Sequence, residues 1–211
     1  PKGFKMLACM LHCCRRTWDF YKAHDISGGI FVDTMKCFSR FVKEHKESFG
    51  YYGFDRQWWT ARQLCGLLFR IGELEYEMRT DGEEKIISLH IPSDALLTRE
   101  KALHSIRQAR TFLDEKFPEY AGAGTECHSW LLSPTLREVL SPGSNILAFQ
   151  ELFDIEVLGE DQAEEYKVWV FKRSDIPLAD LPENTSLQRR MKDYLLSGGK
   201  MLEAKGRLKA L

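Results

Sequence analysis

The spacing of apolar residues changes near residue 70, and this change limits most strongly what the chain can fold into. Before it, Phe4 and Leu11 belong to a series of apolar residues three or four apart, as in a helix that buries one face. After it, Leu74, Tyr76 and Met78 alternate with glutamates, which is typical of a strand with one buried face. The sequence therefore predicts a helical N-terminal part followed by a sheet.

A hairpin and a crossover follow from the second pattern. The first strand, in "GELEYEMR", turns at an Asp-Gly pair into a return strand, "KIISLHIP", which Pro92 ends. Thr98 is a suitable cap for a helix that runs to about Phe117, and a further strand is expected at 127–132. Because strand, helix and strand in this order imply a right-handed crossover, residues 86–91 and 127–132 are predicted to pair in parallel.

The N-terminal part is expected to hold three helices. The first ends at "DISGG", the second begins at Ile30, and the third has Asp55 as its N-cap residue. Three regions are predicted along the chain: a helical segment at 1–66, a sheet-containing domain at 67–173, and a linker with C-terminal helices at 174–211.

The chain beyond the crossover is predicted from shorter patterns. A short helix is expected in "SPTLREVL", and a second helix has Ser144 or Asn145 near its N-cap. A second hairpin is expected, with strands Ile155 to Leu158 and Tyr166 to Lys172. The tail, Leu187 to Leu211, is predicted to form one or two helices broken at "SGG".

Charge and hydropathy argue against two classes of partner. The chain has 30 Lys plus Arg against 31 Asp plus Glu, so it lacks the basic excess of a duplex-binding protein, and no nucleic acid is expected. No apolar run approaches the roughly 18 residues that span a bilayer, so no membrane partner is expected. The opening "PKGFKMLACMLHCCRR" has no small-residue cleavage site of a secretory signal, and we predict a cytoplasmic protein.

The six cysteines fall within apolar patterns, which predicts buried, reduced thiols in an intracellular protein. Cys9, His12 and Cys13 would share one helical face, as ligands of a zinc ion do. The sequence offers no fourth ligand at a suitable spacing. Core packing is therefore the preferred explanation, and no metal is expected.

Five stretches resemble a known family: "YGFDRQWW", "FRIGELEYE", "HIPSDALLT", "CHSWLL" and "SNILAFQ". Together they look like a little-characterised bacterial family of GNAT-like acyltransferases with a helical N-terminal part. The predicted order of elements after residue 69 is similar to the second half of the GNAT fold, and "NILAF" resembles its Asn-x-x-Ala helix start. The resemblance covers about residues 50 to 173. It implies an α+β (mixed α/β) fold, with a parallel pair of strands that splay apart and helices on both faces of a mixed sheet.

The resemblance also implies a donor site for acetyl-CoA or another acyl-CoA. The donor-binding residues would be Ile91, Ser93, Asp94, Ala95, Leu96, Leu97, Thr98 and Asn145. The pyrophosphate would lie at the backbone amides from Ser93 to Thr98, and the pantetheine arm would run between the two strands. Backbone N–H groups at a helix N-terminus hold phosphate without a particular side chain. Two features depart from the family pattern. The turn contains no glycine, and Leu152 stands where a tyrosine often protonates the leaving thiolate.

Four polar residues are candidates for acid or base catalysis on this mapping. His128 and His90 lie on the two strands that would flank the acyl group, Ser129 follows His128, and Glu75 lies on the first strand. A histidine titrates near neutral pH, which suits a group that takes a proton from an attacking amine. Cys127 and His128 are neighbours in a strand, so their side chains point to opposite faces and cannot form a nucleophile–base dyad.

Simpler interpretations compete with these roles. A histidine in a strand is more often a packed residue, and alternating glutamates usually form a solvated face. Two classes of function therefore stay open: an acyl-CoA-dependent N-acyltransferase with an unknown amine acceptor, and a catalytically inactive GNAT-like module that binds a ligand or a protein. The missing glycine turn and tyrosine favour the module, whereas the polar residues on the central strands favour the enzyme. A homodimer is compatible with either.

Overall fold

Three helices form the N-terminal part, as the sequence predicts. The structure is a computed structural model that describes residues 2–210. Its first helices are α1 (Phe4–Ala23), α2 (Gly28–Phe49) and α3 (Gln57–Leu64). Ser27 begins α2 by accepting a hydrogen bond from the Ile30 N–H at 3.3 Å. The prediction that Asp55 caps α3 is wrong, because Arg56 holds the N-cap position and the Asp55 carboxylate contacts the Arg56 guanidinium at 3.1 Å.

Two compact units divide the chain. Unit 1 contains the residues up to 96 together with 100–124, and unit 2 contains 97–99 and the residues from 125 onward. Each unit has its own strands and its own buried core. The predicted parallel pairing of 86–91 with 127–132 would join the units, and it stays a prediction.

The sheet of unit 1 has three antiparallel strands in chain order: β1 (Leu68–Ile71), β2 (Leu74–Asp81) and β3 (Glu84–His90). The predicted hairpin is confirmed, with Met78 opposite Ile87 in the register of β2 and β3. Strand β1 was not predicted, because its four residues are too few to show an alternating pattern.

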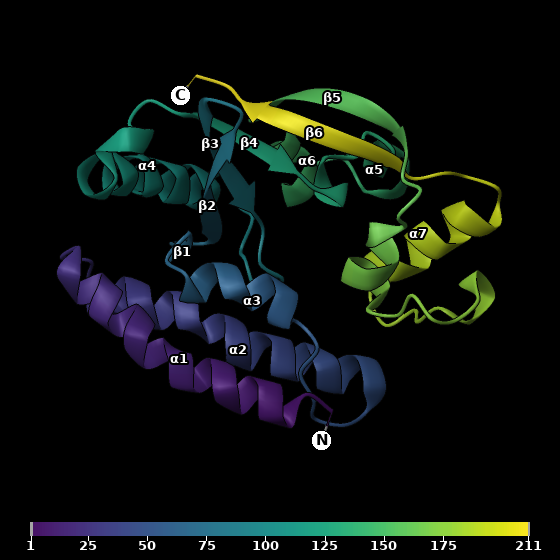
Figure 1. The fold of residues 1–211 in the computed structure, drawn as a ribbon. Coiled ribbons are helices and arrows are strands. Elements are labelled where there is room, and N and C mark those ends of the chain that lie inside the picture. The colour runs from purple at the N-terminus through teal and green to yellow at the C-terminus, as the bar shows by residue number, and fades with distance from the viewer. Residues whose placement is uncertain (1, 211) are drawn as a thin grey trace. The chain divides into compact units, whose positions relative to one another are not determined.

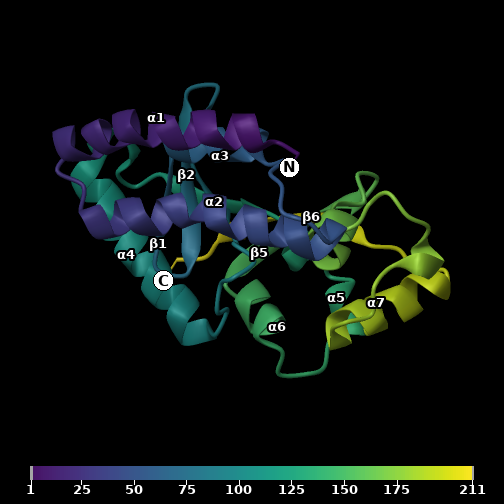
Figure 2. The same ribbon diagram turned by 90° about the horizontal axis from the view of Figure 1, so that it is seen from below.

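The two faces of this sheet differ in chemistry. The apolar face packs against α4 (Arg99–Lys116), where the Phe69 and Phe112 rings lie 5.1 Å apart. The buried Ser105 hydroxyl of α4 contacts the Tyr76 hydroxyl at 2.9 Å, accepts from the Leu74 N–H at 3.2 Å and donates to the Ile71 carbonyl. The opposite face carries charged residues, among them Glu75, which contacts Arg40 of α2. Helix α2 crosses this face (Figure 2). Helices α1 and α2 run side by side in both views (Figures 1 and 2).

Unit 2 has three antiparallel strands in the order β4 (Gly124–His128), β6 (Leu202–Leu208), β5 (Phe153–Glu160). Strand β4 is shorter than the predicted strand at 127–132, because Trp130–Leu132 form a 3-10 turn instead. The second hairpin is also wrong: the partner of β5 is β6, and Lys167–Phe171 form a π-helical turn. The tail contains α7 (Ser186–Leu196) as predicted, followed by β6 rather than a helix.

The π-helical turn buries Tyr166, Val170 and Phe171, a helical spacing that packs into a core with Leu136 and Met191. Two short helices complete unit 2, α5 (Leu136–Val139) and α6 (Asn145–Gln150). In the part of the chain that the structure describes, no helix is both long and apolar enough to cross a membrane.

The cysteines differ from the prediction of buried thiols. Cys37 and Cys127 are buried, whereas Cys9, Cys13 and Cys65 are exposed. Core packing therefore does not explain the Cys9, His12, Cys13 pattern. Within residues 2–210, no three His, Cys, Asp or Glu side chains are grouped so that they could hold a metal ion.

Replacing Ser105 with alanine is expected to destabilise unit 1 by about 1–3 kcal/mol, because the buried Tyr76 hydroxyl and Leu74 N–H lose their shared partner. Urea unfolding followed by circular dichroism measures this change. Ser39→Ala is the control, since Ser39 is exposed on α2. Equal unfolding midpoints for the two variants would contradict the role of Ser105 as a stabilising hydrogen-bond partner in unit 1.

Candidate functional site

A row of charged residues crosses the three strands of unit 1. Arg70 pairs with Glu75 in the register of β1 and β2, and Glu75 pairs with His90 in the register of β2 and β3. Residues that lie opposite each other on antiparallel strands have their side chains on the same face of the sheet. Glu77 lies on this face too, because residues two apart in a strand point the same way. The interpretation of these glutamates as a solvated face is wrong, because Glu75 is only 2% exposed.

Glu75 forms a buried ion pair with α2. Its Oε1 accepts a hydrogen bond from Arg40 Nη2 at 2.7 Å, and the Arg40 side chain is 8% exposed. Arg40 Nη1 also lies 3.5 Å from the Asp94 carboxylate. Burial alone would lower the pKa of Arg40, but Glu75 and Asp94 outweigh burial and raise this pKa above its ordinary value. The guanidinium therefore stays charged beneath the sheet.

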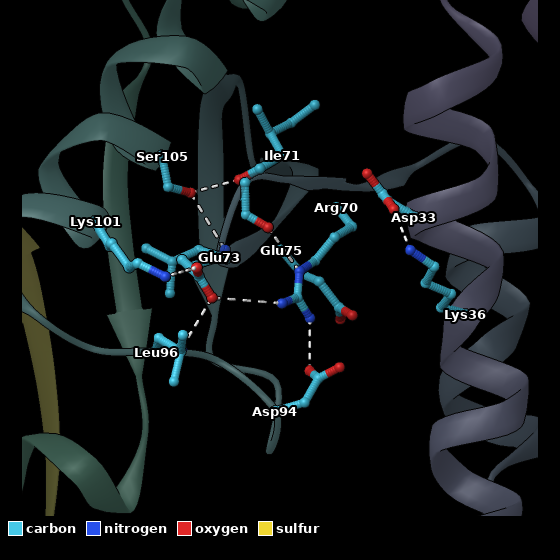
Figure 3. Close-up of polar contacts among 12 residues, drawn as sticks. Asp33, Lys36, Arg70, Ile71, Glu73, Glu75, Asp94, Leu96, Lys101 and Ser105 are labelled. Carbon is cyan, nitrogen blue, oxygen red and sulfur yellow. Dashed lines mark hydrogen bonds and ion pairs between the residues drawn. The ribbon is translucent and has the colours of Figure 1, made fainter.

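The turn that follows β3 is tied to the same network (Figure 3). Arg70 Nη1 donates to the Asp94 carboxylate at 2.8 Å, and the Leu96 N–H donates to Glu73 Oε2 at 2.9 Å. Lys101 of α4 reaches the other Glu73 oxygen at 3.2 Å. The Leu96 N–H and Lys101 lower the pKa of Glu73, so this carboxylate is ionised at neutral pH. The turn thus holds an anion that the protein itself supplies.

Two further turn residues also have partners in unit 1. The Ala95 N–H donates to the Pro92 carbonyl at 3.0 Å, and the Ser93 hydroxyl donates to the Glu44 carboxylate. The N–H groups of Ala95 and Leu96, which the sequence predicts as pyrophosphate ligands, are therefore both engaged, the first within the turn and the second with Glu73. A phosphate would compete with these contacts.

His90 lies at the end of β3 between a carboxylate and an aromatic ring. Its Nε2 is 2.8 Å from Glu77 Oε2, and Arg62 Nε donates to Glu77 Oε1 at 3.0 Å. The ring of Trp59 meets the His90 ring edge-on, with centroids 4.9 Å apart. Burial would raise the pKa of Glu77, but His90 and Arg62 lower it below its ordinary value. His90 is thus a positioned but largely enclosed imidazole.

His128 is the last residue of β4, in unit 2. Its Nε2 lies 2.7 Å from Glu203 Oε1 of β6, and its side chain is 53% exposed. The preceding Cys127 is fully buried, and burial raises its pKa to about 12, so this thiol does not ionise at neutral pH. Ser129 begins the 3-10 turn, its Oγ accepting from the Leu131 N–H at 3.2 Å. His128 is therefore the polar group of this stretch that faces solvent.

The predicted site residues fall into both units. Unit 1 brings together Glu75, His90, Ile91, Ser93, Asp94, Ala95 and Leu96. Unit 2 holds Leu97, Thr98, His128, Ser129 and Asn145. Asn145 is the first residue of α6, whose N-cap Ser144 accepts from the Ile146 N–H at 3.2 Å.

Sequence reasoning missed the cations of unit 1 and the carboxylate beside His128. Arg40 gives a signal in retrospect, since it lies between Phe38 and Phe41 on a face of α2 that is otherwise largely uncharged. Glu203 also gives a signal in retrospect, since "LEAKGRL" alternates charged residues with apolar or small ones, but this segment was predicted to be helical.

Two family models match this chain. The GNAT-like C-terminal domain matches residues 68–208, and the N-acyltransferase N-terminal domain matches residues 1–66. Together the two models cover nearly the whole chain, and both describe acyltransferase domains. The chain belongs to the family that the GNAT-like C-terminal domain defines.

Solved structures of acyltransferases have the same fold. One in complex with decanoyl-CoA and teicoplanin is 26% identical, with a TM-score of 0.85 over 95% of this chain and 65% of that one. One in complex with CoA and 10C-teicoplanin has a TM-score of 0.87 at 26% identity, over 95% and 64% of the two chains. A third, in complex with decanoyl-CoA, has a TM-score of 0.84 at 28% identity, over 96% of this chain and 63% of that one.

These likenesses confirm the predicted family and fold class, a helical N-terminal part with a mixed α/β domain. The chain spans about 65% of the length of the first of these acyltransferases. A comparison with curated proteins gives no match.

Removing one partner of the Arg40–Glu75 pair is expected to cost about 3–5 kcal/mol of unfolding free energy, because a buried charge is left alone. The double variant Arg40→Met, Glu75→Leu should recover most of this loss, since two apolar groups leave no charge to solvate. Chemical unfolding of the two single variants and the double variant tests this. A double variant no more stable than the worse single one would contradict it.

Proposed function

We propose that this chain carries out acyl-CoA-dependent acyl transfer to an amine. The observation that supports it most directly is the likeness, over 95% of the chain, to an acyltransferase in complex with decanoyl-CoA and teicoplanin. The amine acceptor is our proposal for this chain. Teicoplanin is a useful first acceptor to assay because that relative was solved with it. The cytoplasmic location and the homodimer stay predictions.

His128 is the group we propose as the general base. Its imidazole is about half exposed, so an acceptor from solvent can reach it, and Glu203 holds it by a 2.7 Å contact. His90 is the second candidate, but Glu77 and Trp59 enclose its ring. Glu75 is less suited to this task, because its carboxylate is buried against Arg40. Ser129 caps a turn, and that contact supports a structural role.

The turn after β3 is the proposed site of the donor pyrophosphate. It precedes the N-terminus of the long helix α4, where the helix dipole favours an anion. Lys101 lies in the first turn of that helix, and Arg70 and Arg40 are close to Asp94. In this proposal the phosphate replaces the Glu73 carboxylate at the Leu96 N–H.

The alternative, a binding module without catalysis, also has an observation in its favour. Leu152 is 3% exposed in the core, so no hydroxyl is available at the position of the family's proton donor. The N–H groups of Ala95 and Leu96 are engaged within the protein, which weakens the case for a tightly held donor. Such a module would bind acyl-CoA or a partner protein without turnover.

Glu73→Gln is expected to strengthen coenzyme A binding about fivefold, because unit charges about 4 Å apart repel by about 1 kcal/mol in water. The substitution also removes the carboxylate charge that Lys101 contacts at 3.2 Å. Isothermal titration calorimetry measures the affinity. Glu115→Gln is the charge-matched control, since Glu115 is exposed near the other end of α4. Unchanged or weaker binding by Glu73→Gln would exclude the turn as the pyrophosphate site.

His128→Asn is expected to lower acyl transfer by about 10² to 10⁴, the usual cost of removing a positioned acid or base. Because the His128 side chain is half exposed, the melting temperature of the His128→Asn variant should stay close to that of the wild type. The His90→Asn variant should melt at a lower temperature, because the His90 side chain is largely enclosed. Chromatography of released coenzyme A, with acetyl-CoA and decanoyl-CoA as donors, gives the rates. Acyl-CoA binding by the wild-type chain without turnover would favour the binding module.

A further inference from the structure

Glu203 contacts the proposed base through one nitrogen only, the Nε2 of His128, at 2.7 Å. We propose that Glu203 is a positioning residue that selects the tautomer of His128. The carboxylate accepts the Nε2 proton, so Nδ1 becomes the nitrogen that takes a proton from the acceptor. This inference rests on the proposed acyltransferase function and adds to it the atom that acts as base.

The sheet of unit 2 brings these two residues together. His128 pairs with Lys205 in the antiparallel register of β4 and β6, and Glu203 lies two residues before Lys205. Residues two apart in a strand share a face, so Glu203 is the diagonal neighbour of His128 and its side chain is long enough to reach it. Lys205 instead pairs with Glu126 at 2.8 Å. The four side chains therefore sort into two separate pairs.

A second carboxylate, that of Glu165, also lies within electrostatic reach of His128. Burial raises the pKa of Glu165, as do Asp161 and Glu203, whereas His128 lowers it. Burial is also the main cause of the raised pKa of Asp161. Carboxylates from the segment after β5 and from β6 thus act on one imidazole.

In the proposed transfer step, these groups account for each bond and for the proton. The lone pair of the neutral amine attacks the thioester carbonyl carbon, a C–N bond forms, and the C–S bond breaks. The amine nitrogen loses one proton to Nδ1 of His128. The imidazolium gives that proton to the departing thiolate, so an amide and free coenzyme A are the products. Glu203 keeps its hydrogen bond to Nε2 throughout and gains a full charge partner while the ring is protonated.

The test combines a spectroscopic and a kinetic measurement on the full chain. Two-dimensional ¹⁵N–¹H spectra of the imidazole report which nitrogen of His128 carries the proton. In the wild type we expect the Nε2–H form, and in Glu203→Gln a shift toward a mixture of the two neutral forms. The kcat of Glu203→Gln should fall about 10-fold or more with little change in KM, because only the transition state uses the oriented base.

Two further variants separate positioning from a general change of charge or stability. Glu203→Asp keeps a carboxylate and should retain the Nε2–H form with part of the rate. Glu126→Gln removes a carboxylate from β4, two residues before His128, yet that carboxylate pairs with Lys205, so the tautomer and kcat should stay at the wild-type values. Circular dichroism confirms that each variant is folded.

Each outcome bears on one of the two proposals. A His128 tautomer that is the same in wild type and Glu203→Gln overturns the positioning role, whatever the activity. A changed tautomer with full turnover also overturns it, since Nδ1 would not be the base. A wild-type chain that binds acyl-CoA but transfers no acyl group to any amine tested overturns the acyltransferase function instead, even where the tautomer responds to Glu203.

Discussion

The buried contact between Arg40 and Glu75 is the interaction on which the site of unit 1 depends. Removing two charges from water costs several kcal/mol for each, and the cost is recovered only when the geometry is close and the other donors find acceptors. Arg40 meets this condition by contacting Glu75 with one nitrogen and lying near Asp94 with another. Helix α2, strand β2 and the turn after β3 are therefore held by one side chain.

This network gives the turn its order before any ligand binds. Phosphate-binding turns commonly use glycine, because a backbone without Cβ lets the phosphate approach closely. Here Asp94 is held by Arg70, and the Leu96 N–H is held by Glu73. Under the proposed function, an incoming pyrophosphate replaces the Glu73 carboxylate at this turn, so that the donor affinity is a difference between two electrostatic interactions.

Much of unit 1 could be predicted from the sequence, whereas unit 2 shows why its strands could not. The hairpin of β2 and β3 has strict alternation and a short turn, and both are local features. The apolar run at 168–171 fits a strand or a helix equally well, and only its packing onto Leu136 and Met191 decides for a helix. Strand β6, "LEAKGRL", does alternate charged residues with apolar or small ones, but alanine and glycine are poor strand formers, and pairing with both β4 and β5 decides for a strand.

The sequence by itself determined the helical N-terminal part, the hairpin, the long helix after Pro92 and the family, because each depends on short-range spacing or local motifs. It also named His128 and Glu75 as candidate groups. Only the tertiary structure decided what surrounds them. Arg40 lies 35 residues from Glu75 in the chain, and the Glu203 partner of His128 is supplied by a strand near the C-terminus. Charge pairs of this kind depend on which backbone segments pack together, and no local pattern encodes that packing.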